Sequence, residues 1–128
     1  MHIVFGGKYN GKKKYTINEF APTVFLHQSL HSVDCSQETI CISDFPSIVK
    51  EHLALNEDAA AMAIYSEILR LAEKNVVICV CDDITRGIVP LETEQRKIRD
   101  TLGRLYQMLF SDAESVTQIW FGLEERLK

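Results

Sequence analysis

Glycines and lysines near the start of the chain are spaced in a way that suits phosphate binding. The apolar stretch 3–5 leads into Gly6, and four residues separate Gly6 from Gly11, which Lys12 follows directly. In loops with this spacing, backbone N–H groups at a helix N-terminus cradle phosphates, and the lysine reaches the outer phosphates. The next position normally carries a Ser or Thr whose hydroxyl holds Mg²⁺, but this chain has Lys13. The residues predicted to bind a nucleotide are Gly6, Gly7, Lys8, Asn10, Gly11, Lys12 and Lys13.

This loop has two interpretations. It is either a phosphate site or a tight glycine turn that keeps the shape of one without binding. A strand before the loop and a helix after it favour the phosphate site, and the positive charge of Lys8, Lys12, Lys13 and Lys14 attracts anions by itself. Because an ammonium group at the position of Lys13 repels a metal ion, the same pattern argues against Mg²⁺ there.

Carboxylates follow two of the predicted strands. Asp44 comes after an apolar stretch at the position where phosphate-loop proteins place a metal-coordinating acid, so it either ligates Mg²⁺ or caps the helix that Pro46 begins. Asp82 and Asp83 end the most apolar stretch of the chain, where paired carboxylates can serve as metal ligands or orient a hydroxyl. The alternative for this pair is a solvated turn.

Other polar residues give weaker signals. His27, His31 and Cys35 are spaced four apart and would line one face of a helix, but their segment has the composition of a loop, which disfavours a zinc site. Arg96, Arg99 and Arg104 lie on a predicted helix and face phosphate, a neighbouring subunit or solvent. A glycine inside that helix, Gly103, costs stability and suggests close helix packing. The four cysteines are expected to be free thiols.

The elements that must position these residues alternate along the chain. We expect strands at 2–5, 23–26, 39–42, 76–81 and 116–121, and helices at 12–20, 46–55, 57–72 and 93–110. Such alternation predicts right-handed βαβ units, a mainly parallel sheet flanked by helices, and ligands at the carboxyl ends of the strands. Two helices have apolar faces: Met62, Tyr65, Ile68, Leu69 and Ala72 in one, and Ile98, Leu102, Leu105 and Leu109 in the other.

Size and charge limit the possible functions. The chain has 128 residues, which suits a single domain over 1–128. Its formal charge of −4 gives no reason to expect a nucleic acid or an anionic membrane as partner. No apolar run reaches the length of a membrane span, and the N-terminus does not have the pattern of a signal peptide. We therefore expect a cytoplasmic protein.

Residues near the second half of the chain carry a resemblance to a known family. The run Asp82-Asp83-Ile84-Thr85-Arg86-Gly87-Ile88-Val89-Pro90 precedes a helix with Arg96, Arg99-Asp100, Gly103-Arg104 and Gln107. This resembles the bifunctional adenosylcobinamide kinase/adenosylcobinamide-phosphate guanylyltransferase family, which has a Thr-Asn-Glu-Val-Gly-x-Gly-Ile-Val-Pro loop followed by an Arg-x-x-Arg-Asp-x-x-Gly-Arg-x-Asn-Gln helix. The family also begins with a strand and Gly-Gly-x-x-Ser-Gly-Lys-Ser, so both ends of this chain are similar to it.

The chain departs from the family at several positions. Lys13 replaces the Ser of the glycine loop, Asp82 and Asp83 replace Asn and Glu, and Tyr106 replaces the Asn before Gln107. The middle of the chain is also several dozen residues shorter than in the family, and no residue aligns with the His that the family guanylylates. The comparison therefore implies a short, divergent member that lacks the guanylyltransferase segment.

The resemblance implies a P-loop fold and a function in cobalamin biosynthesis. An active protein would be a kinase that uses ATP or GTP with Mg²⁺ to phosphorylate a hydroxyl of a corrinoid-like alcohol. Its catalytic residues would be Lys12 and Asp83, and its metal ligands Asp44 and Asp83. The alternative is a non-catalytic oligomeric or regulatory protein that retains a degenerate phosphate loop. The family forms trimers, which implies a homo-oligomer.

Overall fold

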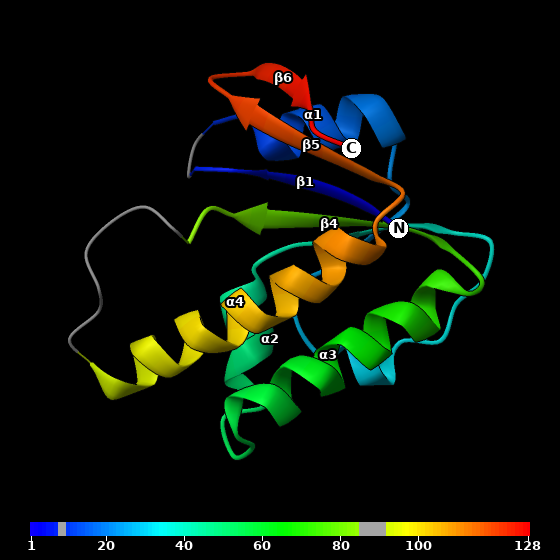
Figure 1. Cartoon of the computed structure of the whole chain (residues 1–128). Helices are drawn as coiled ribbons and strands as arrows, with labels where there is room; N and C mark the ends of the chain where they lie inside the picture. The colour runs from blue at the N-terminus through cyan, green and yellow to red at the C-terminus, as the bar shows by residue number, and fades with distance from the viewer. Residues whose placement is uncertain (8–9, 85–91) are drawn as a thin grey trace.

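The computed structural model describes residues 1–7, 10–84 and 92–128, which form an α/β fold. Figure 1 shows the course of the chain. The strands are β1 His2–Gly6, β2 Val24–Leu26, β3 Thr39–Ile42, β4 Val76–Asp82, β5 Ser115–Trp120 and β6 Leu123–Arg126. The helices are α1 Lys12–Phe20, α2 Phe45–Lys50, α3 Glu57–Ala72 and α4 Thr93–Asp112, with a short 3₁₀ turn at Leu30–Ser32.

The strands make one sheet in the order β2-β3-β4-β1-β5-β6. All neighbouring strands are parallel except β5 and β6, which form an antiparallel hairpin. β1 lies between β4 and β5, with Gly6 in register with Asp82. The carboxyl end of β1 therefore lies beside the carboxyl end of β4, so the glycine loop and the paired aspartates meet at one edge of the sheet.

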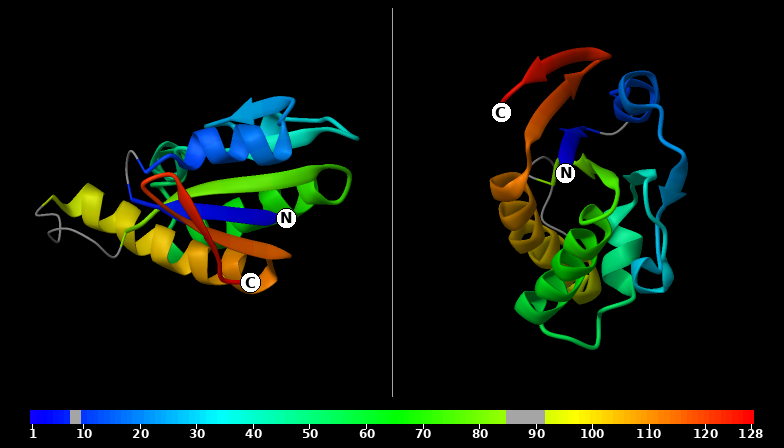
Figure 2. Two further views of the ribbon diagram at one scale, coloured as in Figure 1. Left: turned by 90° about the horizontal axis from the view of Figure 1, so that it is seen from above. Right: turned by 90° about the vertical axis from the view of Figure 1, so that its right-hand side faces the viewer.

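Helices cover both faces of the sheet, which confirms the predicted three-layer α/β class. Figures 1 and 2 show α1 on one face and α2, α3 and α4 on the other. The smaller cluster, under α1, is built on Val4, Ile78 and Ile119, with Tyr15 and Phe20 packed against it. The larger cluster lies under the other helices. β4 contributes to both clusters because it is apolar on both faces, as expected for a covered central strand.

The apolar face predicted for α4 is confirmed, because Ile98, Leu102, Leu105 and Leu109 are all buried. The face predicted for α3 is partly wrong. Met62 and Leu69 are exposed, and the residues of α3 that are buried are Ala60, Ala61, Ile64, Ile68 and Leu71. Burial therefore follows a stripe that includes the two small alanines rather than Met62 and Leu69.

Two boundaries differ from the prediction. Helix α2 ends at Lys50, because the chain then tightens into turns in which the N–H of His52 donates to the carbonyl of Val49 at 2.8 Å. Strand β6 was not predicted, since all its residues are exposed and lack apolar alternation. It pairs with β5 through Phe121 and Gly122, whose φ angles of 47° and 81° suit a two-residue hairpin turn.

Within the described residues, none of the helices combines the length and the apolar composition that a membrane span requires.

Candidate phosphate-binding site and adjoining cavity

The glycine loop joins β1 to α1 as the sequence predicts. Gly6 is buried at the end of β1, and a Cβ there would lie 2.5 Å from the carbonyl oxygen of Ile119, so only glycine fits without a shift. Gly11 has φ 90° and ψ 17°, a left-handed conformation that directs the chain into α1. The backbone therefore has the strand, loop and helix order of a phosphate site. Lys8 and Tyr9 lie outside the described residues.

The hairpin of β5 and β6 supports the loop from the other side. The N–H of Gly122 donates to the carbonyl of Asn10 at 2.8 Å. A Cβ on Gly11 would lie 3.4 Å from the Cα of Gly122, so the two backbones approach closely. The sequence prediction missed this contact, because it depends on a strand that carries no apolar pattern.

Lys12 is the first residue of α1, and its side chain points back toward the glycine loop. It is only 7 % exposed. Its Nζ donates to the carbonyl oxygens of Gly6 at 3.1 Å and Gly7 at 2.7 Å, and forms an ion pair with Oδ1 of Asp82 at 2.8 Å. The three N–H groups of an ammonium thus match three acceptors at the mouth of the loop.

The two aspartates at the end of β4 have different surroundings. Asp82 pairs with Lys12, and its side chain is 43 % exposed. The backbone N–H of Asp83 donates to the carbonyl of Gly6 at 2.9 Å, which ties the end of β4 to the start of the loop. The sequence prediction chose Asp83 for the site, whereas the geometry places Asp82 in contact with the lysine. The Thr85–Pro90 part of the predicted loop lies outside the described residues.

The donors at this edge do not fit Mg²⁺ in the usual manner of a phosphate loop. Lys13 stands where the hydroxyl ligand belongs, and it is exposed. Asp44 occupies the N-cap position of α2 with φ 56°, but its side chain does not cap the backbone; its Oδ2 accepts from the Ser47 hydroxyl at 2.7 Å. Asp82 is held by Lys12.

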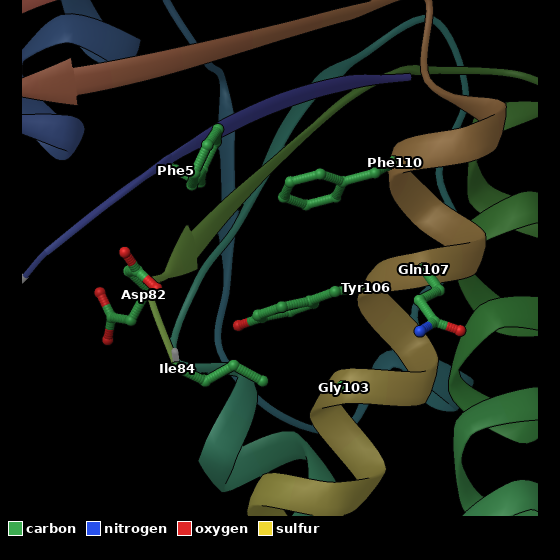
Figure 3. A pocket seen from close by; sticks show the side chains of 8 residues that line it. Phe5, Asp82, Ile84, Gly103, Tyr106, Gln107 and Phe110 are labelled. Carbon is green, nitrogen blue, oxygen red and sulfur yellow. The ribbon is translucent and has the colours of Figure 1, made fainter. Parts of the chain in front are cut away.

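A cavity of about 430 Å³ lies next to the loop, between α4 and the ends of β1 and β4. Figure 3 shows the side chains around it. The lining residues are Phe5, Asp82, Asp83, Ile84, Gly103, Tyr106, Gln107 and Phe110. Aromatic rings and Ile84 form its body, and Asp82 lies at the end of β4 beside it (Figure 3), where its carboxylate also contacts Lys12. The cavity thus joins an apolar space to the candidate phosphate site.

Tyr106 contributes a buried hydroxyl to this cavity. The hydroxyl makes no hydrogen bond of standard geometry among the described residues, although the Cys81 thiol lies close enough to act on it as a hydrogen-bond partner. Burial raises the pKa of Tyr106 well above its ordinary value, and the nearby Cys81 thiol and Asp82 carboxylate raise it further. The phenol therefore stays protonated and able to donate a hydrogen bond at neutral pH.

With this geometry in place, a comparison with family models matches residues 4–127 to the family described as cobinamide kinase / cobinamide phosphate guanyltransferase. The chain belongs to that family. Membership confirms the resemblance inferred from the two ends of the sequence and the P-loop type of the fold, and it supports a role in cobalamin biosynthesis with nucleotide and corrinoid substrates. A search among curated proteins finds no match.

The contacts of Arg104 and Gly103 bear on two predictions made for α4. Arg104 forms an ion pair with Asp58 of α3, Nε to Oδ1 at 2.8 Å, so it serves a surface contact between helices. Among the residues that the structure describes, a Cβ at Gly103 would meet only the Cδ1 atom of Ile84, at 3.9 Å, and this glycine lines the cavity. These residues therefore give no support to the prediction that Gly103 allows close helix packing.

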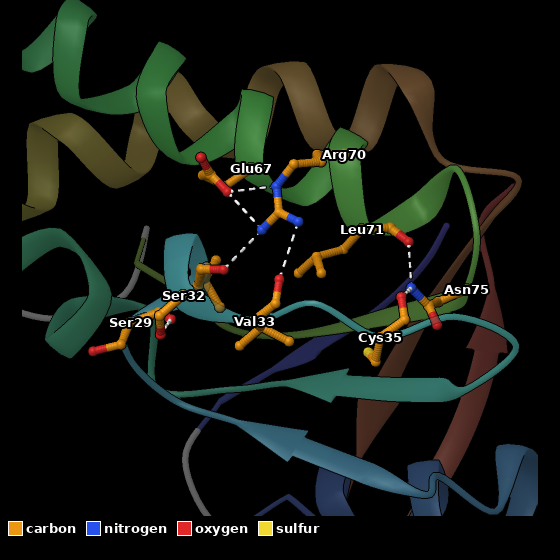
Figure 4. A network of polar contacts seen from close by, with 9 residues as sticks. Ser29, Ser32, Val33, Cys35, Glu67, Arg70, Leu71 and Asn75 are labelled. Carbon is orange, nitrogen blue, oxygen red and sulfur yellow. Dashed lines mark hydrogen bonds and ion pairs between the residues drawn. The ribbon is translucent and has the colours of Figure 1, made fainter.

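The segment with the spaced histidines is organised by other side chains. Arg70 donates to the carbonyls of Leu30 and Val33, each at 3.0 Å, and Asn75 donates to the carbonyl of Cys35 at 2.9 Å (Figure 4). Within the described part of the chain, no group of three or more His, Cys, Asp or Glu side chains is placed to hold a metal ion. The polar network thus accounts for the conformation of this loop.

All four cysteines are free thiols, and three of them are buried: Cys41, Cys79 and Cys81.

Proposed function

We propose that the chain binds the phosphates of ATP or GTP in the loop around Lys12 and, when active, transfers the terminal phosphoryl group to an alcohol. The observation that carries this proposal is the position of the Lys12 ammonium, which lies at the mouth of the loop beside Gly6, Gly7 and Asp82. Family membership supports both the nucleotide and the alcohol, because the family acts on cobinamide.

In this proposal each group has a distinct task. Backbone N–H groups of the loop and of the first turn of α1 hold the phosphate oxygens. Lys12 leaves one or more of its present acceptors and places its charge against the transferring phosphoryl group. Asp83 orients the attacking hydroxyl, as predicted from the sequence. The metal roles predicted for Asp44 and Asp83 stay predictions.

Nucleotide binding is tested by calorimetric titration of ATP and GTP, with and without Mg²⁺, together with thermal unfolding. A ligand at 100 times its Kd should stabilise the fold by about 2.7 kcal/mol. Lys12→Met removes the ammonium but keeps the apolar stem, and we expect it to lose this stabilisation. Lys14→Met is the matched control, because Lys14 is exposed on the same helix turn. Wild-type protein that binds neither nucleotide would contradict the proposal.

The second candidate is a non-catalytic oligomeric or regulatory protein with a retained phosphate loop. Two observations favour it. Lys13 replaces the hydroxyl that would ligate the metal ion, and Asp82 forms an ion pair with Lys12, the residue expected to bind the phosphate. Nucleotide binding without phosphoryl transfer to cobinamide would support this candidate. Sedimentation analysis tests the accompanying oligomer, which family resemblance suggests is a trimer.

The absence of guanylyltransferase activity is a separate proposal. It rests on the short middle of the chain, where no counterpart of the guanylylated His was found. Incubation with labelled GTP should leave no covalent label on the protein. A guanylyl adduct that survives denaturation would show the proposal to be wrong.

A further inference from the structure

We propose that two copies of this chain pair through the outer edge of β6, so that their sheets join across a twofold axis. Strand β6 is last in the strand order, and no other strand of the described residues lies along its outer edge. Figure 1 shows it at the end of the sheet, beyond β5. An open edge presents unpaired N–H and C=O groups, which an added strand can satisfy. The inference concerns an interface and does not rest on the proposed function.

The backbone of β6 directs the polar groups of two residues to this edge. The N–H of Leu127 donates to the carbonyl of Val116 on β5 at 2.8 Å. Because residues along an antiparallel strand alternate in the side to which their backbone groups point, Glu125 is also directed to β5. The backbone groups of Glu124 and Arg126 therefore point to the open edge. A second strand can form hydrogen bonds with these two residues without disturbing β5.

One antiparallel register of β6 with its own copy brings unlike charges together. In that register Glu124 of each copy lies opposite Arg126 of the other, and both pairs exchange backbone hydrogen bonds. The side chains of opposite residues are neighbours across the interface, where unlike charges attract. The next registers that keep these hydrogen bonds would oppose Glu124 to its own copy or Arg126 to its own copy. Charge complementarity thus selects both the occupant and the register.

The two charged side chains already lie on one face of the sheet. In the hairpin, Glu124 is opposite Ile119, which is buried beneath α1, and Arg126 is opposite Thr117. Glu124, Arg126 and Thr117 line one hollow beside α1. Arg126 Nε donates to the carbonyl of Lys128 at 3.0 Å. Among the described residues, neither Glu124 nor Arg126 forms an ion pair within its own chain, so a second copy can supply one.

Apolar side chains on the other face of β6 also favour pairing. Leu123 is 74 % exposed and Leu127 is 52 % exposed. They flank Glu125 on this face, and in the proposed register Leu123 of one copy lies opposite Leu127 of the other. Pairing removes part of this apolar surface from water, which favours association. Glu125 meets its own copy at the axis, and the repulsion between these two carboxylates weakens the dimer.

Sedimentation velocity and light scattering across a range of concentrations measure the assembly of the full chain without nucleotide. We expect dimers, or hexamers if the trimer implied by the family resemblance also forms through another surface. Wild-type protein that stays monomeric or trimeric up to about 1 mM would overturn the inference and leave the edge to a strand of another protein. Nucleotide titration of the same samples tests the proposed function separately.

Charge reversal decides whether the proposed register forms. Glu124→Arg and Arg126→Glu each turn both attractive pairs into repulsive ones, so each should weaken pairing by at least about tenfold. The double variant exchanges the two charges and should pair as wild type does. Glu73→Arg reverses an exposed charge at the end of α3 and should leave the mass unchanged. Pairing retained in folded Glu124→Arg, or lost in the folded double variant, would overturn the inference.

The axis and the backbone bonds supply a second test. Glu125→Gln removes the like charges at the axis and should tighten pairing by about fivefold. Amide hydrogen exchange at Glu124 and Arg126 should slow as the concentration rises, whereas exchange at Glu125 should not change, because its N–H already bonds to β5. Unchanged exchange at Glu124 and Arg126 in samples that have associated would place the interface elsewhere and overturn the inference.

Discussion

The ammonium of Lys12 lies 2.8 Å from Oδ1 of Asp82, so the lysine expected to bind phosphate is already paired with a carboxylate. The register of the sheet creates this contact, because Gly6 at the end of β1 is aligned with Asp82 at the end of β4. A phosphate must compete with Asp82 for Lys12. The strength of this pair therefore sets the affinity of the loop for anions.

We predict that Asp82→Asn tightens ATP or GTP binding. The substitution removes a negative charge beside the phosphate site and frees Lys12. The gain should be about fivefold, because a partly exposed ion pair is worth roughly 1 kcal/mol or less. Calorimetric Kd values measure it. Asp112→Asn removes an equal charge from the exposed end of α4 and should leave the Kd unchanged; equal effects of both variants would contradict a specific competition.

We predict that Lys13 determines whether nucleotide binding depends on Mg²⁺. We expect wild-type protein to bind nucleotide equally well with Mg²⁺ or with a chelator, because an ammonium stands in place of the hydroxyl ligand. Lys13→Ser should create a dependence on Mg²⁺ of about tenfold in Kd, or roughly 1.4 kcal/mol. Lys14→Ser removes the neighbouring exposed lysine as the matched control. If wild-type binding requires Mg²⁺, this account of Lys13 is wrong.

Two glycines should respond to alanine with opposite signs. Gly6→Ala forces a Cβ to within 2.5 Å of the Ile119 carbonyl, so we expect the free energy of unfolding to fall by about 1–3 kcal/mol. Among the described residues, the Cβ of Gly103→Ala meets only Ile84, at 3.9 Å, and the substitution should raise the free energy of unfolding by about 1 kcal/mol. Urea unfolding of both proteins measures the changes. Destabilisation by Gly103→Ala would mean that the glycine is needed for packing.

Stability should depend on pH through His2. Burial lowers the pKa of His2 below its ordinary 6.5, and the N-terminal ammonium adds to this effect. The unfolded chain therefore takes up a proton at a higher pH than the folded chain. The His2 contribution to stability is present above pH 6.5 and is lost as the pH falls below it.

Urea unfolding between neutral and mildly acidic pH measures this dependence. We expect His2→Gln to reduce the slope, because Gln does not titrate and can retain the bond that His2 Nδ1 makes with Ser115 Oγ at 2.7 Å. An unchanged slope in this variant would assign the dependence to other groups.

Much of the fold could be predicted from the sequence, because the spacing of apolar residues along most elements matches the residues that are buried in the structure. The apolar run at 77–81 forms the covered central strand, and the spacing in α4 places its four predicted residues in the core. In α3 this agreement fails. Met62 and Leu69 fit a helical spacing, but the buried stripe of this helix runs through Ala60, Ala61, Ile64, Ile68 and Leu71, so the two larger residues remain exposed.

The sequence by itself determined the α/β class, the phosphate-loop spacing and the family resemblance, because these depend on residue types at fixed separations along the chain. Only the tertiary structure decided that Asp82 rather than Asp83 meets Lys12, that the hairpin of β5 and β6 supports the loop at Asn10, and that Gly103 faces a cavity. Each of these depends on strand register and on which helix covers which face. Those relationships join residues far apart in the chain, and no local pattern encodes them.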